Sequence, residues 1–136
     1  MSGHKIYDTP LLKKIGVKEN QHIILINAPE FILRLFEDAS FIFDLKQNKN
    51  IQYNIVWAFL NSVPRLESCL KQHRTSIAAH GMIWISWYKK ASGQPSQINE
   101  NIIRDTALSL DLVDVKVVSV DDQWSALKMV IPLNKR

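Results

Sequence analysis

Short segments that are apolar on both faces alternate with helix-forming segments along this chain of 136 residues. Residues 22–26 (HIILI), 55–60 (IVWAFL) and 82–88 (MIWISWY) carry few polar side chains. Strands carry few polar side chains when both of their faces are buried, as in a parallel sheet that lies between two layers of helices. The alternation therefore predicts an α/β fold with a mostly parallel sheet.

Capping residues mark where the helices between these strands begin. Pro29 suits a first helical turn, and Ser62 and Asn99 carry side-chain oxygens that can accept a hydrogen bond from such a turn. The middle helix is expected to run on towards Gly81, because apolar side chains recur at three- and four-residue spacing as far as Ile77. Each helix then connects parallel strands by a right-handed crossover.

Four further segments complete the predicted order. A short helix covers residues 10–15, residues 41–45 form an added strand, and residues 113–120 and 124–131 pair as an antiparallel hairpin. The result is a three-layer, Rossmann-like, mostly parallel sheet closed by a C-terminal hairpin. This order resembles the methyltransferase-like version of the fold. At about 100–200 residues per domain, residues 1–136 are expected to form a single domain.

Polar and aromatic side chains follow the strands at the carboxyl edge of this sheet, where ligands bind in folds of this kind. The candidate ligand-binding residues are Asn27, Asp44, Asn61, Lys89, Lys90, Ser92, Asp121 and Trp124. The run from Lys89 to Ser92 offers charges and a hydroxyl that suit a phosphate or carboxylate, and the preceding aromatic residues suit a planar ring. A solvated loop with one aromatic side chain packed in the core is the simpler interpretation of this stretch, and a small anionic or planar ligand is the functional one.

The turn after the first strand lacks the glycines that cofactor sites use. Dinucleotide and S-adenosylmethionine sites place glycine there because the backbone approaches the ligand closely. No glycine lies between Gly16 and Gly81, Pro29 removes an N–H donor, and Glu30 places a carboxylate where a phosphate would bind. On this ground we expect no cofactor.

The sequence shows no constellation typical of catalysis or of metal binding. Its single cysteine, Cys69, falls four residues before His73 on one helix face, and two ligands do not make a zinc site. An inert buried thiol and a histidine at the core boundary are the simpler interpretation. We therefore expect no catalytic residue and no metal ion, and the sequence leans away from an enzyme.

Charge and apolar content restrict the partners. The net charge is +4 and the pI about 9.3, but the cations form scattered pairs rather than a patch, so we do not expect a nucleic-acid partner. The longest apolar runs fall far short of the ~20 residues that span a membrane, and the first residues show no apolar core of a signal peptide. A single cysteine suits a reducing compartment. We expect a cytoplasmic protein, with a protein partner as an alternative to a small ligand.

Eight short segments carry a further signal. They are residues 9–11, 14–18, 24–30, 81 with 84–87, 89–93, 99–100 with 103–104, 112–116, and 121 with 124–128. In this order they resemble a bacterial domain-of-unknown-function family of short proteins. The resemblance implies a trimmed methyltransferase-like Rossmann fold and a bacterial, cytoplasmic protein, and it carries no established activity.

Three functions follow from these patterns. The main interpretation is a non-catalytic module that binds a small anionic or planar ligand, or a protein partner, at the carboxyl edge of the sheet. The alternative is a divergent S-adenosylmethionine-dependent methyltransferase, which the element order and the closing hairpin favour. The third is a nucleic-acid accessory protein, which rests on the pI and the lysine pairs alone.

Overall fold

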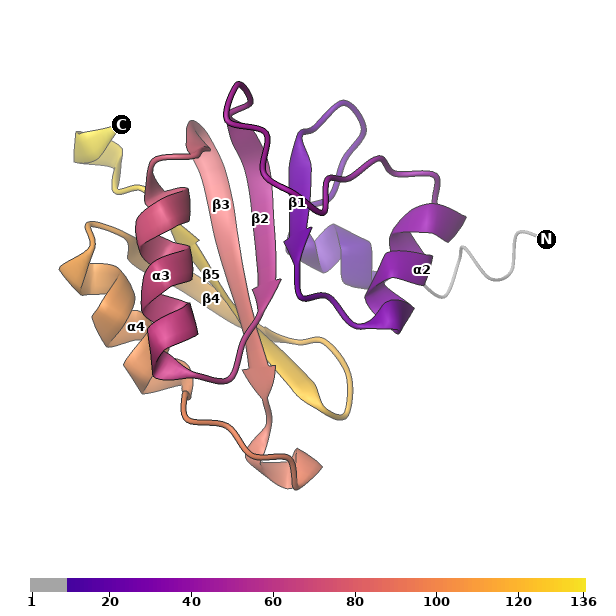
Figure 1. Cartoon of the computed structure of the whole chain (residues 1–136), viewed down its shortest axis with the longest axis vertical. Helices are drawn as coiled ribbons and strands as arrows, with labels where there is room; N and C mark the ends of the chain where they lie inside the picture. The colour runs from indigo at the N-terminus through magenta and orange to yellow at the C-terminus, as the bar shows by residue number, and fades with distance from the viewer. Residues whose placement is uncertain (1–9) are drawn as a thin grey trace.

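Five strands form a sheet in the computed structural model, which describes residues 10–136. The strands β1 (Ile23–Ile26), β2 (Tyr53–Phe59) and β3 (Ile77–Tyr88) are parallel, and β4 (Val113–Ser119) and β5 (Trp124–Val130) form an antiparallel hairpin. Their order across the sheet is β1-β2-β3-β5-β4, with β5 antiparallel to β3 (Figure 1). The structure thus confirms the α/β class, the mostly parallel sheet and the closing hairpin.

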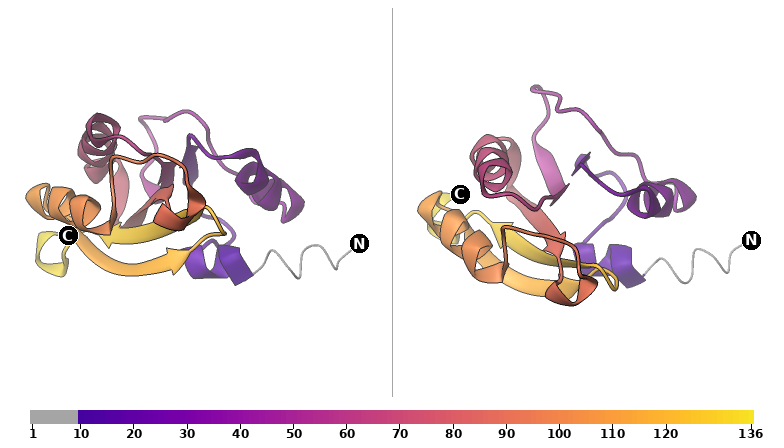
Figure 2. Two further views of the ribbon diagram at one scale, coloured as in Figure 1. Left: turned by 90° about the horizontal axis from the view of Figure 1, so that it is seen from below. Right: turned by 60° about the horizontal axis from the view of Figure 1, so that its bottom comes forward.

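Helices cover both faces of this sheet. The helices α3 (Val63–Arg74) and α4 (Glu100–Ser109) pack on one face, and α2 (Glu30–Asp38) and a helix over residues 10–15 pack on the other (Figures 1 and 2). Each face has its own cluster of buried apolar side chains. Because the parallel strands are covered on both sides, their sequences are apolar on both faces.

The predicted helix starts are confirmed by their caps. The Ser62 hydroxyl accepts a hydrogen bond from the N–H of Arg65 at 3.3 Å, and the Asn99 side chain accepts one from Ile102 at 2.9 Å. Pro29 directly precedes α2 in an extended conformation. These signals are local, which is why the sequence places them correctly.

The middle helix is shorter than predicted. α3 ends at Arg74, and both Ile77 and Gly81 belong to β3. Ile77 pairs with Tyr53 of β2, and a Cβ atom on Gly81 would lie 2.7 Å from the Tyr53 carbonyl oxygen. Gly81 therefore permits a close approach between two strands, and the prediction that it ends a helix was wrong.

Residues 41–45 do not form the predicted strand. Asp44 alone joins the sheet, as an isolated bridge beside β1. The rings of Phe41 and Phe43 instead pack edge-on against Phe36 of α2, with centroids 6.4 and 5.6 Å apart. The two phenylalanine rings thus pack on a helix, whereas Ile42 and Leu45 are exposed, and the segment does not extend the sheet.

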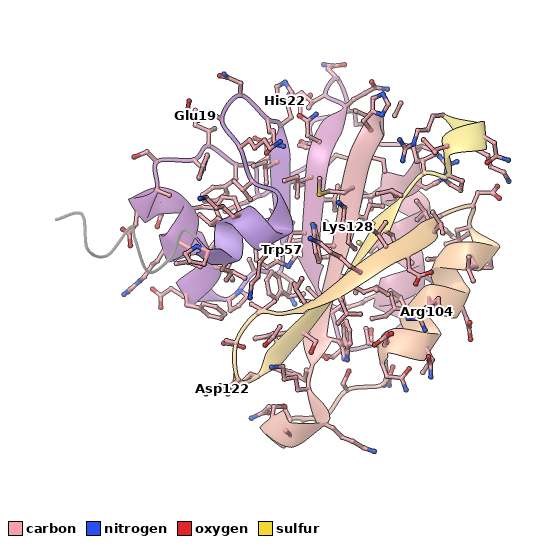
Figure 3. The ribbon with its side chains drawn as sticks, turned by 180° about the vertical axis from the view of Figure 1, so that it is seen from behind. Glu19, His22, Trp57, Arg104, Asp122 and Lys128 are labelled. Carbon is pink, nitrogen blue, oxygen red and sulfur yellow. The ribbon has the colours of Figure 1, made fainter. Side chains whose placement is uncertain are left out.

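Side-chain hydrogen bonds join the strands to one another and to the helices. The indole N–H of Trp84 in β3 donates to the carbonyl of Ile15 at 2.9 Å, and that of Trp57 donates to the Ser86 hydroxyl at 2.8 Å. Arg104 of α4, labelled in Figure 3, pairs through Nε with Asp114 of β4 at 2.9 Å. Within residues 10–136, no helix has the length and apolar character that crossing a membrane requires.

Candidate functional site

A cavity of about 500 Å³ opens at the carboxyl ends of β1 and β2, the edge that faces the viewer in the left panel of Figure 2. This cavity is called the first pocket below. It is lined by Asn27 after β1, residues 60–62 after β2, Arg65 in α3, and residues 95–97 before α4. Small-molecule sites typically span roughly 300–1,000 Å³. The pocket therefore has the size and the position of a ligand site in this kind of sheet.

Asn27 shapes the turn that leaves β1. Its φ is +56°, in the left-handed region that glycine favours and that asparagine tolerates. Its side-chain N–H donates to the carbonyl of Phe59 at 2.9 Å, which holds the turn against the end of β2. The chain thus makes a left-handed turn at this point without a glycine. The missing glycine, on which we based the expectation of no cofactor, therefore does not exclude a left-handed turn after β1.

The carboxylate of Glu30 is paired on the surface. It accepts a hydrogen bond from Arg34 at 3.1 Å, and both side chains are largely exposed. Glu30 does not line the first pocket. A solvated and paired carboxylate opposes an anion in the pocket less than the sequence argument assumed.

Arg65 provides a cation in the first pocket. Its guanidinium makes no hydrogen bond or ion pair within the described part of the chain, since the bond to Ser62 is made by the backbone N–H of Arg65. A cation in the first turn of a helix lies at the positive end of the helix dipole, which is unfavourable unless an anion is near. Sequence reasoning missed Arg65, and its position against the dipole is the signal that could have revealed it.

A second cavity, of about 520 Å³, lies at the end of β3. This cavity is called the second pocket below. It is lined by residues 87–90, residues 93–96, Ile98 and Asn99. Pro95 and Ser96 line both pockets, so the loop before α4 forms a common wall. Two of the predicted site residues, Lys89 and Lys90, meet here, and no carboxylate belongs to this lining.

The loop after β3 is held by hydrogen bonds of its own residues. The Lys89 ammonium donates to the Ser119 hydroxyl at 2.7 Å. The Ser92 hydroxyl donates to the Lys89 carbonyl at 2.6 Å and accepts from the N–H of Gln94 at 3.1 Å, which closes the short turn η1 (Lys90–Ser92). Ser92 therefore shapes the loop, whereas the two lysines line the second pocket.

Trp87 and Tyr88 end β3 with their rings on opposite faces of the sheet. Trp87 belongs to the apolar cluster on the α3–α4 face and lines the second pocket. The Tyr88 ring packs on the other face, where it stacks on Trp124 with centroids 4.1 Å apart and Trp124 contacts Phe59 edge-on at 5.1 Å. Trp124 is buried and is not part of the lining, so the aromatic surface of the second pocket comes from Trp87.

Asp44 and Asp121 lie outside both linings, as do Ser92 and Trp124. Asp44 accepts a hydrogen bond from the Tyr53 hydroxyl at 2.7 Å. Asp121 accepts from the backbone N–H groups of Gln123 and Trp124 at 2.9 and 2.8 Å, which fixes the turn of the closing hairpin. In the structure both carboxylates hold the fold locally.

Asn61 connects the two pockets. Its side-chain oxygen accepts a hydrogen bond from the N–H of Tyr88 at 2.9 Å, and its carbonyl accepts one from Gln97 at 2.8 Å. The residue thus joins the end of β2 to the end of β3 and to the loop before α4. It stands beside Asn27 in the first pocket.

Cys69 and His73 are structural in this fold. Burial raises the pKa of the Cys69 thiol to about 12, so the thiol stays protonated and unreactive. His73 is buried, with Nδ1 2.7 Å from the Ser76 hydroxyl. Residues 10–136 contain no group of three or more histidine, cysteine or acidic side chains that could hold a metal ion.

Burial of His73 predicts a loss of stability in mild acid. Burial lowers the pKa of His73 from its usual 6.5, so below about pH 6.5 the unfolded chain takes up the proton more readily than the folded one. The free energy of unfolding should fall as the pH drops from 7.5 to 5.5. Urea unfolding at several pH values measures this slope, and His73→Asn, which cannot take up the proton, should flatten it. An equal slope in the variant would contradict the assignment.

Solved structures share this fold, although no protein-family model matches the chain and no curated protein is significantly similar in sequence. The CcbJ methyltransferase from Streptomyces caelestis matches with a TM-score of 0.58 and 8% identity, over 96% of this chain and 95% of that one. Magnesium protoporphyrin IX methyltransferase (ChlM) from Synechocystis with bound SAH matches with 0.60 and 10%, over 96% and 84%. A S-adenosylmethionine-dependent methyltransferase from Clostridium acetobutylicum matches with 0.58 and 6%, over 93% and 90%.

These likenesses identify the fold as the methyltransferase-like form of the Rossmann fold. They also correct our main interpretation, a non-catalytic module at the carboxyl edge of the sheet. The matching structures are methyltransferases, and the divergent methyltransferase that we kept as the alternative agrees with them better.

Proposed function

We propose that the protein is a divergent methyltransferase that binds S-adenosylmethionine in the first pocket. The observation that carries this proposal is the left-handed turn at Asn27, which faces a cavity at the carboxyl ends of β1 and β2 in a methyltransferase-like sheet. Ligands of such sheets bind at this edge. The left-handed backbone at Asn27 supports the proposal because it is the conformation that a glycine would favour at this turn.

The side chains of the first pocket suit the amino-acid end of S-adenosylmethionine. The guanidinium of Arg65 can bind a carboxylate through two parallel hydrogen bonds, and the start of α3 adds a favourable dipole. Leu60 and Pro95 offer apolar surface for the adenine ring, and Ser96 and Gln97 offer polar groups for the ribose. The pocket lining contains no carboxylate, so the ribose hydroxyls would meet hydroxyl and amide groups.

The residues of the two pockets would position the methyl donor and the nucleophile. When bound, S-adenosylmethionine supplies a methyl group on a positively charged sulfur; transfer to a nucleophile breaks the methyl–sulfur bond, and the electron pair stays on the sulfur. Pro95 and Ser96 separate the first pocket from the second, where there is room for the nucleophile. Since neither lining contains a histidine or a carboxylate, orientation of the reactants is the contribution that these residues can make.

Calorimetric titration tests the proposal. S-adenosylmethionine and S-adenosylhomocysteine should each bind with one saturable site, and Arg65→Ala should weaken both about tenfold, because a charged hydrogen bond to a carboxylate is lost. Adenosine lacks that carboxylate, so its binding should not respond to the substitution.

Lys71→Ala is the matched control, since it removes a cation from the far end of the same helix. Absence of saturable binding of both ligands at millimolar concentration would contradict the proposal. Equal weakening of adenosine by Arg65→Ala would show that the residue supports the fold and does not bind the carboxylate.

Three other expectations from the sequence remain predictions. They are membership of the bacterial family of short proteins that the sequence resembles, a cytoplasmic location and a single domain. The ligand-binding roles of the residues predicted from the sequence are proposals of the same kind.

A further inference from the structure

We infer that the second pocket binds the methyl acceptor, and that this acceptor is a planar molecule with a carboxylate or phosphate group that pairs with Lys90. The acceptor role rests on the proposed function, because it requires a methyl donor in the first pocket. The chemical class of the ligand rests on the second pocket alone.

The two pockets are neighbours. Pro95 and Ser96 line both of them, and the side chain of Asn61 in the first pocket bonds the backbone of Tyr88 in the second. A donor and an acceptor must be held next to each other for direct transfer. The second pocket meets this condition at the carboxyl edge of the described sheet.

The charge of the second pocket points to an anion. Lys89 and Lys90 line it and no carboxylate does. Lys89 is fixed at both ends, since its backbone N–H donates to Gln123 at 2.8 Å and its ammonium donates to Ser119 at 2.7 Å. Lys90 has no hydrogen bond or ion pair from its ammonium within residues 10–136. Two adjacent cations repel each other, and a bound anion relieves that repulsion with charge-assisted hydrogen bonds.

The aromatic ring of the pocket points to a planar ligand. Trp87 lines the cavity and keeps 8% of its surface exposed, and its ring belongs to the apolar cluster on the α3–α4 face, as does Ile98 of the same lining. The neighbouring Tyr88 ring packs on Trp124 on the opposite face of the sheet and takes no part in this contact. An indole ring beside two ammonium groups suits a flat ring that carries an acidic substituent, since stacking and ion pairing then act on one rigid molecule.

Three probes separate the contributions. Benzoate and phenyl phosphate carry the two anionic groups, and benzamide has the shape of benzoate without its charge. Each is titrated by NMR into the full chain, with and without S-adenosylhomocysteine. We expect benzoate or phenyl phosphate to bind and to perturb Trp87 and Lys90, and benzamide to bind at least tenfold more weakly. A preference between the two anions then identifies the acidic group as carboxylate or phosphate.

Variants locate the site. Lys90→Glu should weaken the anion about tenfold or more and leave S-adenosylhomocysteine binding unchanged. Lys49→Glu makes the same change of net charge on an exposed loop remote from the pocket and should have no effect. Equal binding of benzamide, no response to Lys90→Glu, or an equal response to Lys49→Glu would each overturn the inference.

Failure of this inference is distinguishable from failure of the proposed function. S-adenosylhomocysteine binding without binding of either anion overturns the second pocket's assignment and leaves the proposed function intact. Binding of an anion without S-adenosylhomocysteine overturns the acceptor role together with the proposed function.

Discussion

Replacing Gly81 by alanine is expected to lower the free energy of unfolding by about 3 kcal/mol, an effect at the upper end for overpacking a buried site. The added Cβ would lie 2.7 Å from the carbonyl oxygen of Tyr53 and 3.0 Å from that of Ala78. Both are backbone atoms of the sheet, so neither can turn aside as a flexible side chain can. Urea unfolding followed by circular dichroism measures the loss.

Gly93→Ala is the matched comparison. Gly93 has a φ of +74° with nothing within 4 Å of an added Cβ, so alanine there meets only the conformational cost of the left-handed region, about 1 kcal/mol. Gly81 carries no such conformational requirement, and its cost comes from contact alone. A smaller loss at Gly81 than at Gly93 would show that β2 and β3 can separate locally.

Replacing Asn27 by valine is expected to remove both stability and cofactor binding. A β-branched side chain is strained at a φ of +56°, and the hydrogen bond to the Phe59 carbonyl is lost. Together these changes should cost about 2–3 kcal/mol. The turn that lines the first pocket would also shift, so S-adenosylhomocysteine binding should weaken by more than tenfold in calorimetry.

Two further substitutions at Asn27 separate the fold from the binding. Asn27→Gly tolerates the left-handed turn and should keep both stability, within about 1 kcal/mol, and binding. Asn27→Asp accepts the backbone conformation but adds a negative charge near the carboxylate of the ligand, so binding should fall while the fold persists. If Asn27→Asp binds S-adenosylhomocysteine as tightly as the native chain, the ligand's carboxylate does not lie near this turn.

Local signals in the sequence predicted much of the fold. Ser62 and Asn99 cap their helices because a side-chain oxygen three residues before a free N–H suffices for the bond. The closing hairpin followed from two strand-forming segments joined by a short polar turn. Such features depend on a few neighbouring residues and carry over directly from sequence to structure.

Errors arose where distant residues decide the outcome. Glycine often ends a helix, but Gly81 lies in a strand, where the absence of a Cβ atom allows close approach to the Tyr53 carbonyl. Tyr53 is far away in the sequence. Phe41 and Phe43 alternate as in a strand, but both rings pack on Phe36, and that contact competes with strand pairing. A short apolar run cannot distinguish the two uses.

The candidate site could also be predicted only in part, because some of its features depend on local sequence and others on distant residues. The sequence places Asn27, Asn61, Lys89 and Lys90 at the correct edge because strand ends determine that edge. It could not reveal that Asn27 adopts the conformation of a glycine, since the bond to Phe59 that stabilises this turn comes from the neighbouring strand. Arg65 was missed because an arginine in a helix usually serves only the surface.

The indoles of Trp57 and Trp84 have no surface exposed to water, and both indole N–H groups are bonded inside the protein. An indole in such surroundings fluoresces at shorter wavelength than one in water. The native chain should therefore emit towards the blue, with a red shift as unfolding releases the helix over residues 10–15 from Trp84. The same hydrogen bond should make the Trp84 indole proton among the slowest in the molecule to exchange with deuterium.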